Sequence, residues 1–161
     1  MRVSGADVWT GWWQSYSGNP NIFTRAWPYT WGLCPRHTAG PVEQDINLRR
    51  EMIFVNTVML TQVLALVQMS PGTFFVDEAN AVAYIYPAVS TKINNATVEV
   101  STRGSLFAAF GRTNLVLRGI RFEQSNACRY NDAVEFNGGS NFLIEANGFN
   151  RFLELRDRPS L

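Results

Sequence analysis

Residues 106–122 read LFAAFGRTNLVLRGIRF, and residues 133–149 read AVEFNGGSNFLIEANGF. The two stretches align without a gap at an offset of about 27 residues, within the usual range of solenoid repeats. Asn114 then falls on Asn141. Each copy reads as a strand, a glycine turn, a second strand, a short turn and a third strand. This pattern predicts that each copy forms one coil of a parallel β-solenoid.

The alternation of side chains along each strand divides every copy between an inward and an outward face. Adjacent parallel strands lie about 4.8 Å apart, so matched residues such as Phe122 and Phe149 should touch. Arg118 and Glu145 also match, and we expect them to form a solubilising surface ion pair worth about 0–1 kcal/mol. The side chains expected to point inward are Phe107, Ala109, Leu115, Leu117, Ile120 and Phe122 in the first copy, and Val134, Phe136, Phe142, Ile144 and Phe149 in the second.

The composition fits one folded domain and excludes several partners. With 161 residues, 46% of them apolar and 17% charged, the chain can bury a core and is not expected to be disordered. The formal net charge is +1 and no basic run occurs, so a nucleic-acid partner is not expected. No apolar stretch is long enough for a membrane span, and the first residues lack the apolar stretch of a signal peptide.

The cysteines and the histidine are too sparse to define a metal site. Cys34 and Cys128 could pair in an oxidising compartment or remain free buried thiols. His37 is the only histidine, and no second histidine or cysteine lies at metal-ligand spacing from it. No carboxylate cluster has the spacing of a calcium loop, so we assign no metal ligand.

The chain divides into four segments within a single partial domain, residues 1–161. Residues 1–50 are rich in loops and aromatic side chains, and residues 51–96 should form a strand and hairpin insertion. Residues 97–150 should hold the coils. Residues 151–161 carry several charges and no glycine turn, which predicts an irregular tail.

Turn signals in the second segment predict two strand pairs. Two apolar strands should flank Asn56-Thr57, although the glycine of a tight hairpin is missing there. A further pair should be joined by residues 77–80, which are typical of a turn. Residues 97–102 alternate in polarity and should form one strand that leads into the repeats.

Three of the five tryptophans, Trp9, Trp12 and Trp13, lie within the first thirteen residues. Neither a strand period nor a helix period holds for long between Asp7 and Pro35, which indicates a long loop rich in aromatic side chains, here called the aromatic excursion. Two interpretations remain open. Either the excursion lines a groove in which Trp12 and Trp13 bind sugar rings, or its aromatic side chains pack as a lid over one end of a core.

Several stretches together resemble bacterial right-handed parallel β-helix proteins of the pectin-lyase-like superfamily. The resemblance covers roughly residues 3–150, and β-helical glycoside hydrolases of the β-xylosidase type are the described enzymes most similar to it. The stretches that carry the resemblance are RREMIFVN at residues 49–56, LTQVL at 60–64, PGTFFVDE at 71–78, YIYP at 84–87 and TNLVLRGIRF at 113–122.

The resemblance implies an all-β fold: a right-handed parallel β-helix with few coils, a loop-rich aromatic N-terminal region and a β-hairpin insertion. Members of the superfamily are several times longer, and this chain lacks the usual hairpin glycine near Thr57. We therefore expect a fragment of a longer protein, inactive by itself, whose exposed strand edges make it fold poorly alone. The resemblance also implies export, to the extracellular space or the cell envelope, for the full-length parent.

Enzymes of this superfamily use the outer face of one stacked sheet as a sugar groove. Hydrolysis of a glycosidic bond needs two carboxyl groups, about 5–5.5 Å apart for retention or about 6.5–9.5 Å apart for inversion. Asp132 and Glu135 are the catalytic candidates, because Glu135 should point outward with Asp132 at the entrance of its strand. As the alternative, these residues only solvate a loop and satisfy its turns. The candidate substrate-binding residues are Glu123, Asn126, Arg129, Trp12 and Trp13.

The most favoured function is that of a glycoside hydrolase segment acting on plant or microbial polysaccharide. A polysaccharide lyase is one alternative, and it would use a base near a sugar proton together with Ca²⁺ or an arginine. A non-catalytic β-helix protein that binds glycans at the cell surface is the other. A polysaccharide or oligosaccharide partner is expected in each case, and no cofactor is expected unless the lyase alternative brings in Ca²⁺.

Overall fold

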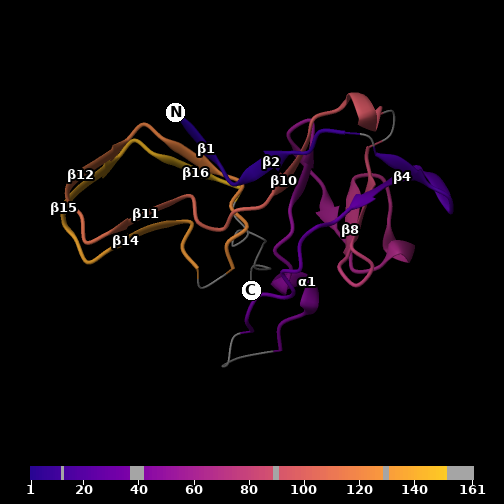
Figure 1. Ribbon diagram of the computed structural model, residues 1–161, viewed down its shortest axis with the longest axis horizontal. Helices are drawn as coiled ribbons and strands as arrows, with labels where there is room; N and C mark the ends of the chain where they lie inside the picture. The colour runs from indigo at the N-terminus through magenta and orange to yellow at the C-terminus, as the bar shows by residue number, and fades with distance from the viewer. Residues whose placement is uncertain (12, 37–41, 89–90, 129–130, 152–161) are drawn as a thin grey trace, which may run out of the picture. The chain divides into compact units, whose positions relative to one another are not determined.

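The computed structural model describes residues 1–11, 13–36, 42–88, 91–128 and 131–151. This part of the chain is all-β, apart from one α-helical turn and two short 3₁₀ helices (Figure 1). The strands are β1 (Arg2–Ser4), β2 (Ala6–Val8), β3 (Gln14–Tyr16), β4 (Asn19–Ala26), β5 (Ile53–Val55), β6 (Val58–Met59), β7 (Thr61–Gln62), β8 (Thr73–Asp77), β9 (Val82–Tyr86), β10 (Val98–Ser101), β11 (Phe107–Phe110), β12 (Thr113–Arg118), β13 (Arg121–Glu123), β14 (Val134–Asn137), β15 (Ser140–Glu145) and β16 (Gly148–Asn150). The helices are α1 (Asp45–Leu48), η1 (Leu66–Gln68) and η2 (Ile93–Asn95).

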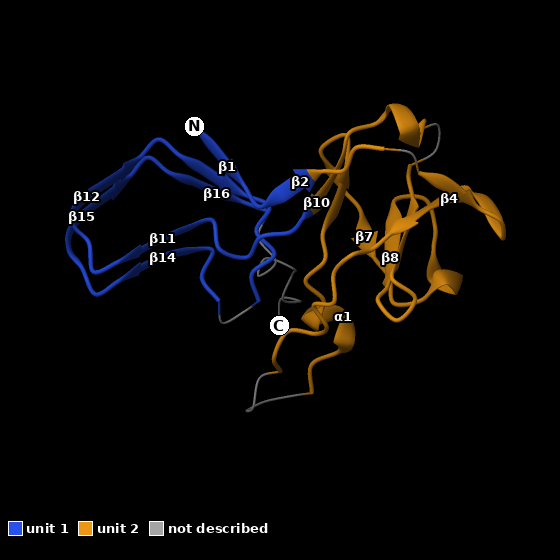
Figure 2. Cartoon of the chain, viewed as in Figure 1, with its two compact units in different colours: residues 1–7, 101–161 blue, residues 8–100 orange. Residues whose placement is uncertain are grey.

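The chain forms two compact units (Figure 2). The repeat unit consists of residues 1–7 and 101–161, and the sheet unit consists of residues 8–100. Each unit has its own pattern of strand pairing, so the two are described separately.

In the repeat unit, the two copies of the sequence repeat lie on one another in register. β11 pairs with β14, β12 with β15 and β13 with β16, all in parallel (Figure 1). Phe122 lies opposite Phe149. The N-terminal strand β1 pairs in parallel with the other edge of β13, in the order β1-β13-β16. The register read from the sequence repeat is therefore confirmed.

The corners of the two copies share one backbone conformation. Asn114 and Asn141 both have φ of 58°, in the left-handed region, which asparagine tolerates better than most residues. The Asn141 side-chain amide donates a hydrogen bond to Asn114 Oδ1. Because matched corners bend in the same way, the strands that follow them stay superposed. The four matched pairs with positive φ are Gly111 and Gly138, Asn114 and Asn141, Gly119 and Ala146, and Gln124 and Arg151.

The inward side chains stack, but they are not equally covered. The rings of Phe122 and Phe149 lie 5.6 Å apart between centroids and are nearly parallel. Phe122 is 1% exposed, whereas Phe149 is 51% exposed, because its strand β16 lies at the edge of the sheet. Ile144, also expected to point inward, is 47% exposed. The first copy thus holds the better-buried part of this stack.

The outward ion pair between Arg118 and Glu145 forms as expected. The two residues are register partners on β12 and β15, and both side chains are exposed. A pair in this setting is screened by solvent, so it contributes little to stability.

The sheet unit is built mainly from antiparallel strands. Its largest sheet has five strands in the order β3-β4-β9-β8-β7, in which only the β7–β8 pair is parallel among the pairings described. A second sheet includes β10, β5 and β6, and its β10–β5 and β5–β6 pairs are antiparallel.

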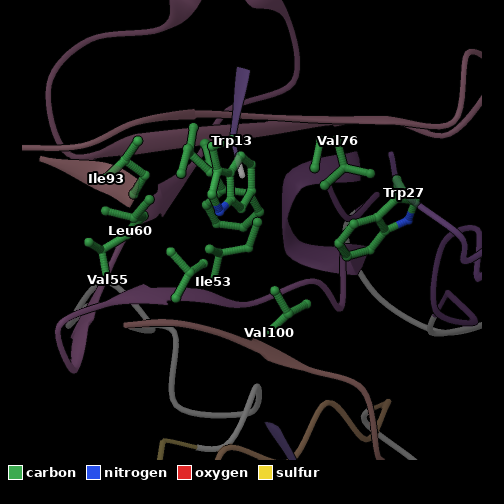
Figure 3. Packing of buried hydrophobic residues seen from close by; sticks show 12 residues of the cluster. Trp13, Trp27, Ile53, Val55, Leu60, Val76, Ile93 and Val100 are labelled. Atoms are coloured by element: carbon green, nitrogen blue, oxygen red, sulfur yellow. The ribbon is translucent and has the colours of Figure 1, made fainter. Parts of the chain in front are cut away.

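The core of the sheet unit draws side chains from both sheets (Figure 3). Alternate residues of β8 and β9 face those of β5 and β10, as in a two-layer packing of sheets. Trp13 and Trp27 complete the cluster, at 4% and 1% exposure. The full cluster is Trp13, Trp27, Ile53, Val55, Leu60, Phe74, Val76, Ala83, Ile85, Ile93, Val98 and Val100.

The predicted fold class, a right-handed parallel β-helix with an aromatic loop region and a hairpin insertion, is wrong. The structure is a set of several small sheets with both parallel and antiparallel pairs. The physical reason lies in the short connections of the sheet unit. Asn56-Thr57 joins β5 to β6, and residues 78–81 join β8 to β9. Connections of two to four residues join antiparallel neighbours, since parallel neighbours need a longer crossover.

The N-terminal segment also differs from the loop-rich expectation. It contains β3 and β4, which pair with one another and, through β4, with β9. The register shifts between Ser15 and Tyr16, and Pro20 interrupts the alternation along β4. These irregularities hide the strand period in the sequence.

The β5–β6 hairpin turns without glycine. Asn56 and Thr57 have φ of 48° and 69°, so both central residues are left-handed, as a type I′ turn requires. Asn56 Oδ1 accepts a hydrogen bond from Thr97 N at 3.0 Å, and Asn56 N donates to Thr97 O at 2.8 Å. Contacts with Thr97 therefore hold the turn, while the β-branched Thr57 carries the strain.

We predict that Thr57→Gly stabilises the protein by about 0.5–1 kcal/mol. Glycine adopts the left-handed conformation without steric cost, and this gain exceeds the extra chain entropy it loses on folding. Urea denaturation of both proteins measures the difference. Thr61→Gly, at an exposed strand position without positive φ, is the control and should destabilise. A lower midpoint for Thr57→Gly would contradict the strained turn.

We predict that Phe122→Ala destabilises the repeat unit by about 3–5 kcal/mol, because it opens a cavity under a fully buried ring. Phe149→Ala is its matched control and should cost only about 1 kcal/mol, because half of that ring is already in water. Thermal and urea unfolding of the two variants give the comparison. Equal losses would show that the two stacked rings are equally buried.

Candidate functional site

Glu123, predicted to bind substrate, is buried and ion-paired on β13. The Arg2 guanidinium on β1 pairs with the Glu123 carboxylate, whose side chain is only 7% exposed. Arg2 Nη2 also donates to Gln124 Oε1 at 3.0 Å, and Ser4 Oγ donates to the same oxygen at 2.7 Å. These contacts bind β1 to β13 through charge-assisted hydrogen bonds. A role for Glu123 in binding substrate stays a prediction.

Asn126 is buried as well. Its side-chain amide donates to Ser101 O at 3.1 Å, and its backbone N–H donates to Arg103 O at the same distance. Its amide therefore satisfies a buried main-chain carbonyl, as buried polar groups in proteins generally do. Arg129, the third member of this predicted group, lies outside the described residues.

Asp132 and Glu135 lie at the start of the second copy. Asp132 is exposed and precedes β14, and Glu135 is a partly exposed residue of that strand. Glu135 is the register partner of Ala108 on β11, whose small side chain is itself exposed. The structure thus separates the predicted set into two accessible carboxylates and two buried residues, Glu123 and Asn126. Catalysis by the accessible pair stays a prediction.

The aromatic N-terminal segment packs on itself and on the sheet-unit core. Trp13, predicted to bind sugar, is buried in that core, and Trp12 lies outside the described residues. The Tyr29 and Trp31 rings stack at 4.6 Å with an interplanar angle of 17°. Of the two interpretations of this segment, packing therefore fits better for its described part.

Two arginines cover further ring faces in this cluster. The Arg25 guanidinium lies 5.0 Å from the centre of the Trp9 ring, and that of Arg50 lies 5.3 Å from the Trp31 ring. Both distances are within the range of cation–π attraction. Ring faces that hold arginine are not free for a sugar.

An open cleft of about 610 Å³ lies in the repeat unit at the corners that precede β13 and β16. Its lining includes Arg2, Arg121 and Asn147. Asn147 is engaged with the corner of the first copy: its Nδ2 donates to Leu117 O at 2.7 Å, and its Oδ1 accepts from Ile120 N at 3.0 Å. The lining does not include Asp132 or Glu135, so the cleft is separate from the predicted carboxylates.

A row of partly exposed aromatic side chains crosses the five-stranded sheet, on the face opposite its core. Ala83 and Ile85 of β9 are buried in the core, so Tyr84 and Tyr86 point to the other face. Phe75 on β8 is the register partner of Tyr84, and their rings lie 5.8 Å apart with an interplanar angle of 19°. We call Tyr16, Phe75, Tyr84 and Tyr86 the tyrosine face.

Tyr16, on β3, extends this row. Its ring meets the ring of Tyr84 edge-on, with 5.6 Å between centroids. Sequence analysis missed the tyrosine face, although the alternation of Ala83-Tyr84-Ile85-Tyr86 carries a signal for it. The sequence does not show which side of β9 packs against the core, and that side decides whether the tyrosines are buried or exposed.

Asp77 lies two residues beyond Phe75 on β8, hence beside the tyrosine face, and the pKa values of Asp77 and Tyr84 are both shifted. Hydrogen bonds from the Asn80 side chain and backbone, at 2.8 and 3.0 Å, lower the pKa of Asp77. Burial raises the pKa of Tyr84, and the charge of Asp77 and the neighbouring Tyr16 raise it further. At neutral pH the face therefore presents a carboxylate beside a protonated phenol, which is both a donor and an acceptor.

The described residues include neither a candidate metal site nor a candidate membrane-spanning helix. No group of three or more His, Cys, Asp or Glu side chains in that part of the chain could hold a metal ion. Calcium under the lyase alternative stays a prediction. None of the helices described is long and apolar enough to cross a membrane. Cys34 and Cys128 are both buried, and neither is a free thiol.

Comparison with known proteins gives a likeness of structure. No protein-family model matches the chain. No curated protein sequence matches it either. A solved structure of XylC in complex with xylose matches it with a TM-score of 0.54 and 12% sequence identity. The match covers 79% of this chain and 25% of XylC, so the chain spans about a quarter of that protein. At this identity the likeness is one of fold.

We predict that Asn80→Ala weakens the protein above pH 4 and has little effect in stronger acid. A carboxyl whose pKa is lowered by folding contributes stability above its unfolded pKa of about 3.9, and that contribution disappears as the pH falls through the folded value. Urea unfolding from pH 2.5 to pH 6 gives the two curves. They should converge at low pH, while Asn137→Ala, in the repeat unit, should follow wild type. If the difference in unfolding free energy between wild type and Asn80→Ala stayed the same from pH 2.5 to pH 6, the hydrogen bond from Asn80 to the Asp77 carboxylate would be contradicted.

Proposed function

We propose that this chain binds carbohydrate, as a segment of a protein that acts on plant or microbial polysaccharide. The observation that carries the proposal is the structural likeness to XylC over 79% of the chain, since the XylC structure holds xylose. Accessible carboxylates and partly exposed aromatic rings are the groups that recognise sugars, which present hydroxyl groups at their edges and C–H groups on their faces. The parent protein then functions outside the cell or in the cell envelope, where such polysaccharides occur.

The finer form of the proposal is glycoside hydrolysis by Asp132 and Glu135. One carboxyl donates a proton to the glycosidic oxygen, and the other attacks the sugar or activates a water molecule. Solvent reaches Asp132 freely and Glu135 in part, so a polysaccharide chain can approach both. Glu123 cannot easily share this role, because Arg2 already neutralises its buried carboxylate.

Binding without turnover is the second candidate. It is favoured by the tyrosine face, which has partly exposed aromatic rings but, among the described residues of its strands, a single carboxylate, Asp77, which is already bonded to Asn80. Hydrolysis on that face would lack the second carboxyl group that the reaction needs.

We predict that the full 161-residue chain binds xylo-oligosaccharides, measured by calorimetry. If the chain or its longer parent hydrolyses them, Asp132→Asn and Glu135→Gln should each lower kcat by about 10²–10⁴ while binding persists. Glu145→Gln, which removes only the surface partner of Arg118, is the matched control and should leave kcat unchanged.

The outcomes separate the candidates. Binding without hydrolysis by chain and parent favours the non-catalytic function. Cleavage restricted to uronate polymers favours a lyase. Absence of binding to any neutral or acidic oligosaccharide contradicts the proposal that the chain binds carbohydrate.

A further inference from the structure

The rings of the tyrosine face are held in place before any ligand arrives. Tyr16 packs so closely over Gly18 that a Cβ on that glycine would lie 2.5 Å from Tyr16 Cε1. Tyr84 lies between the Tyr16 and Phe75 rings, which contact it edge-on and in a stacked arrangement. Ile22, two residues before Thr24 on β4 and hence on the same side of the strand, is buried at 4% exposure. Rings fixed in this way lose little conformational freedom on binding.

Polar groups surround these rings. Thr24 is the register partner of both Tyr84 and Gln14, so its hydroxyl lies in the same cross-strand row. Asp77 lies two residues beyond Phe75 on β8 and hence on the same face. Apolar ring surfaces with hydroxyl, amide and carboxylate groups around them match an amphipathic ligand such as a pyranose.

The charge of the face selects among sugars. Asp77 is ionised at neutral pH, and it is the charged residue on this face among the described residues of β3, β4, β8 and β9. Arg25 of β4 does not counter it, because Arg25 is the register partner of the core residue Ala83 and lies over Trp9 on the other face. A uronate or a phosphorylated sugar would meet repulsion here, whereas a neutral sugar would not.

We propose that Tyr16, Phe75 and Tyr84 of the sheet unit form a stacking surface for a neutral oligosaccharide, whereas the carboxylates of residues 132–135 belong to the repeat unit. The inference rests on the proposed carbohydrate binding and assigns part of that binding to the sheet unit. The protonated Tyr84 hydroxyl and the Asp77 carboxylate then supply a donor and an acceptor for sugar hydroxyl groups.

The test uses the full chain, with xylohexaose as the probe and calorimetry as the readout. Tyr84→Ala and Phe75→Ala should each weaken binding about tenfold or more, since each removes a stacking ring. Tyr84→Phe keeps the ring and should retain most of the affinity. Phe110→Ala removes an aromatic ring that is 58% exposed in the repeat unit, and it should bind like wild type.

A second measurement, made on the wild-type chain, tests the inference even if the alanine variants do not fold. Amide chemical shifts of the wild-type chain, followed during titration with xylohexaose, should change at Tyr16, Phe75 and Tyr84. Shift changes confined to residues 131–137, or unchanged affinity in folded Tyr84→Ala and Phe75→Ala, overturn the inference and leave carbohydrate binding intact. Tighter binding of an oligogalacturonate than of xylohexaose also overturns it. A wild-type chain that binds neither sugar contradicts both the inference and the proposed function.

Discussion

The parallel register between the two sequence copies is the constraint on which the repeat unit depends. It superposes matched corners such as Asn114 and Asn141, which have the same left-handed backbone conformation. Because the corners agree, three strands of one copy pair with three strands of the other, and Phe122 lies on Phe149. A shift of one residue would reverse every side chain between the inward and outward faces. The repeat therefore determines both the pairing and the burial of these side chains.

A different constraint shapes the sheet unit. Short turns force its neighbouring strands to run antiparallel, and each strand then has one face in the core and one outside. Along β9, Ala83 and Ile85 fill the core while Tyr84 and Tyr86 form the opposite face. The same alternation that builds the core thus places the aromatic rings proposed to bind sugar. One strand pattern therefore accounts both for the core and for the proposed binding surface in this unit.

The sequence allowed prediction where partners are repeated or adjacent. Alignment of the two copies was enough to pair Phe122 with Phe149 and Arg118 with Glu145. The alternation of side chains failed to predict β3 and β4, because a register shift and Pro20 break the strand period there. The ion pair of Glu123 with Arg2 joins residues 121 positions apart, and no local sequence pattern predicts a partner at that distance along the chain. The tyrosine face was visible as alternation, but its direction depends on tertiary packing.

The register of the two copies can be tested directly by measuring nuclear Overhauser effects between aromatic rings in the folded chain. The account predicts cross-peaks between the ring protons of Phe122 and Phe149, whose centroids lie 5.6 Å apart. Cross-peaks of Phe122 to residues of the second copy that do not match it, with none to Phe149, would contradict the register and the fold of the repeat unit built on it.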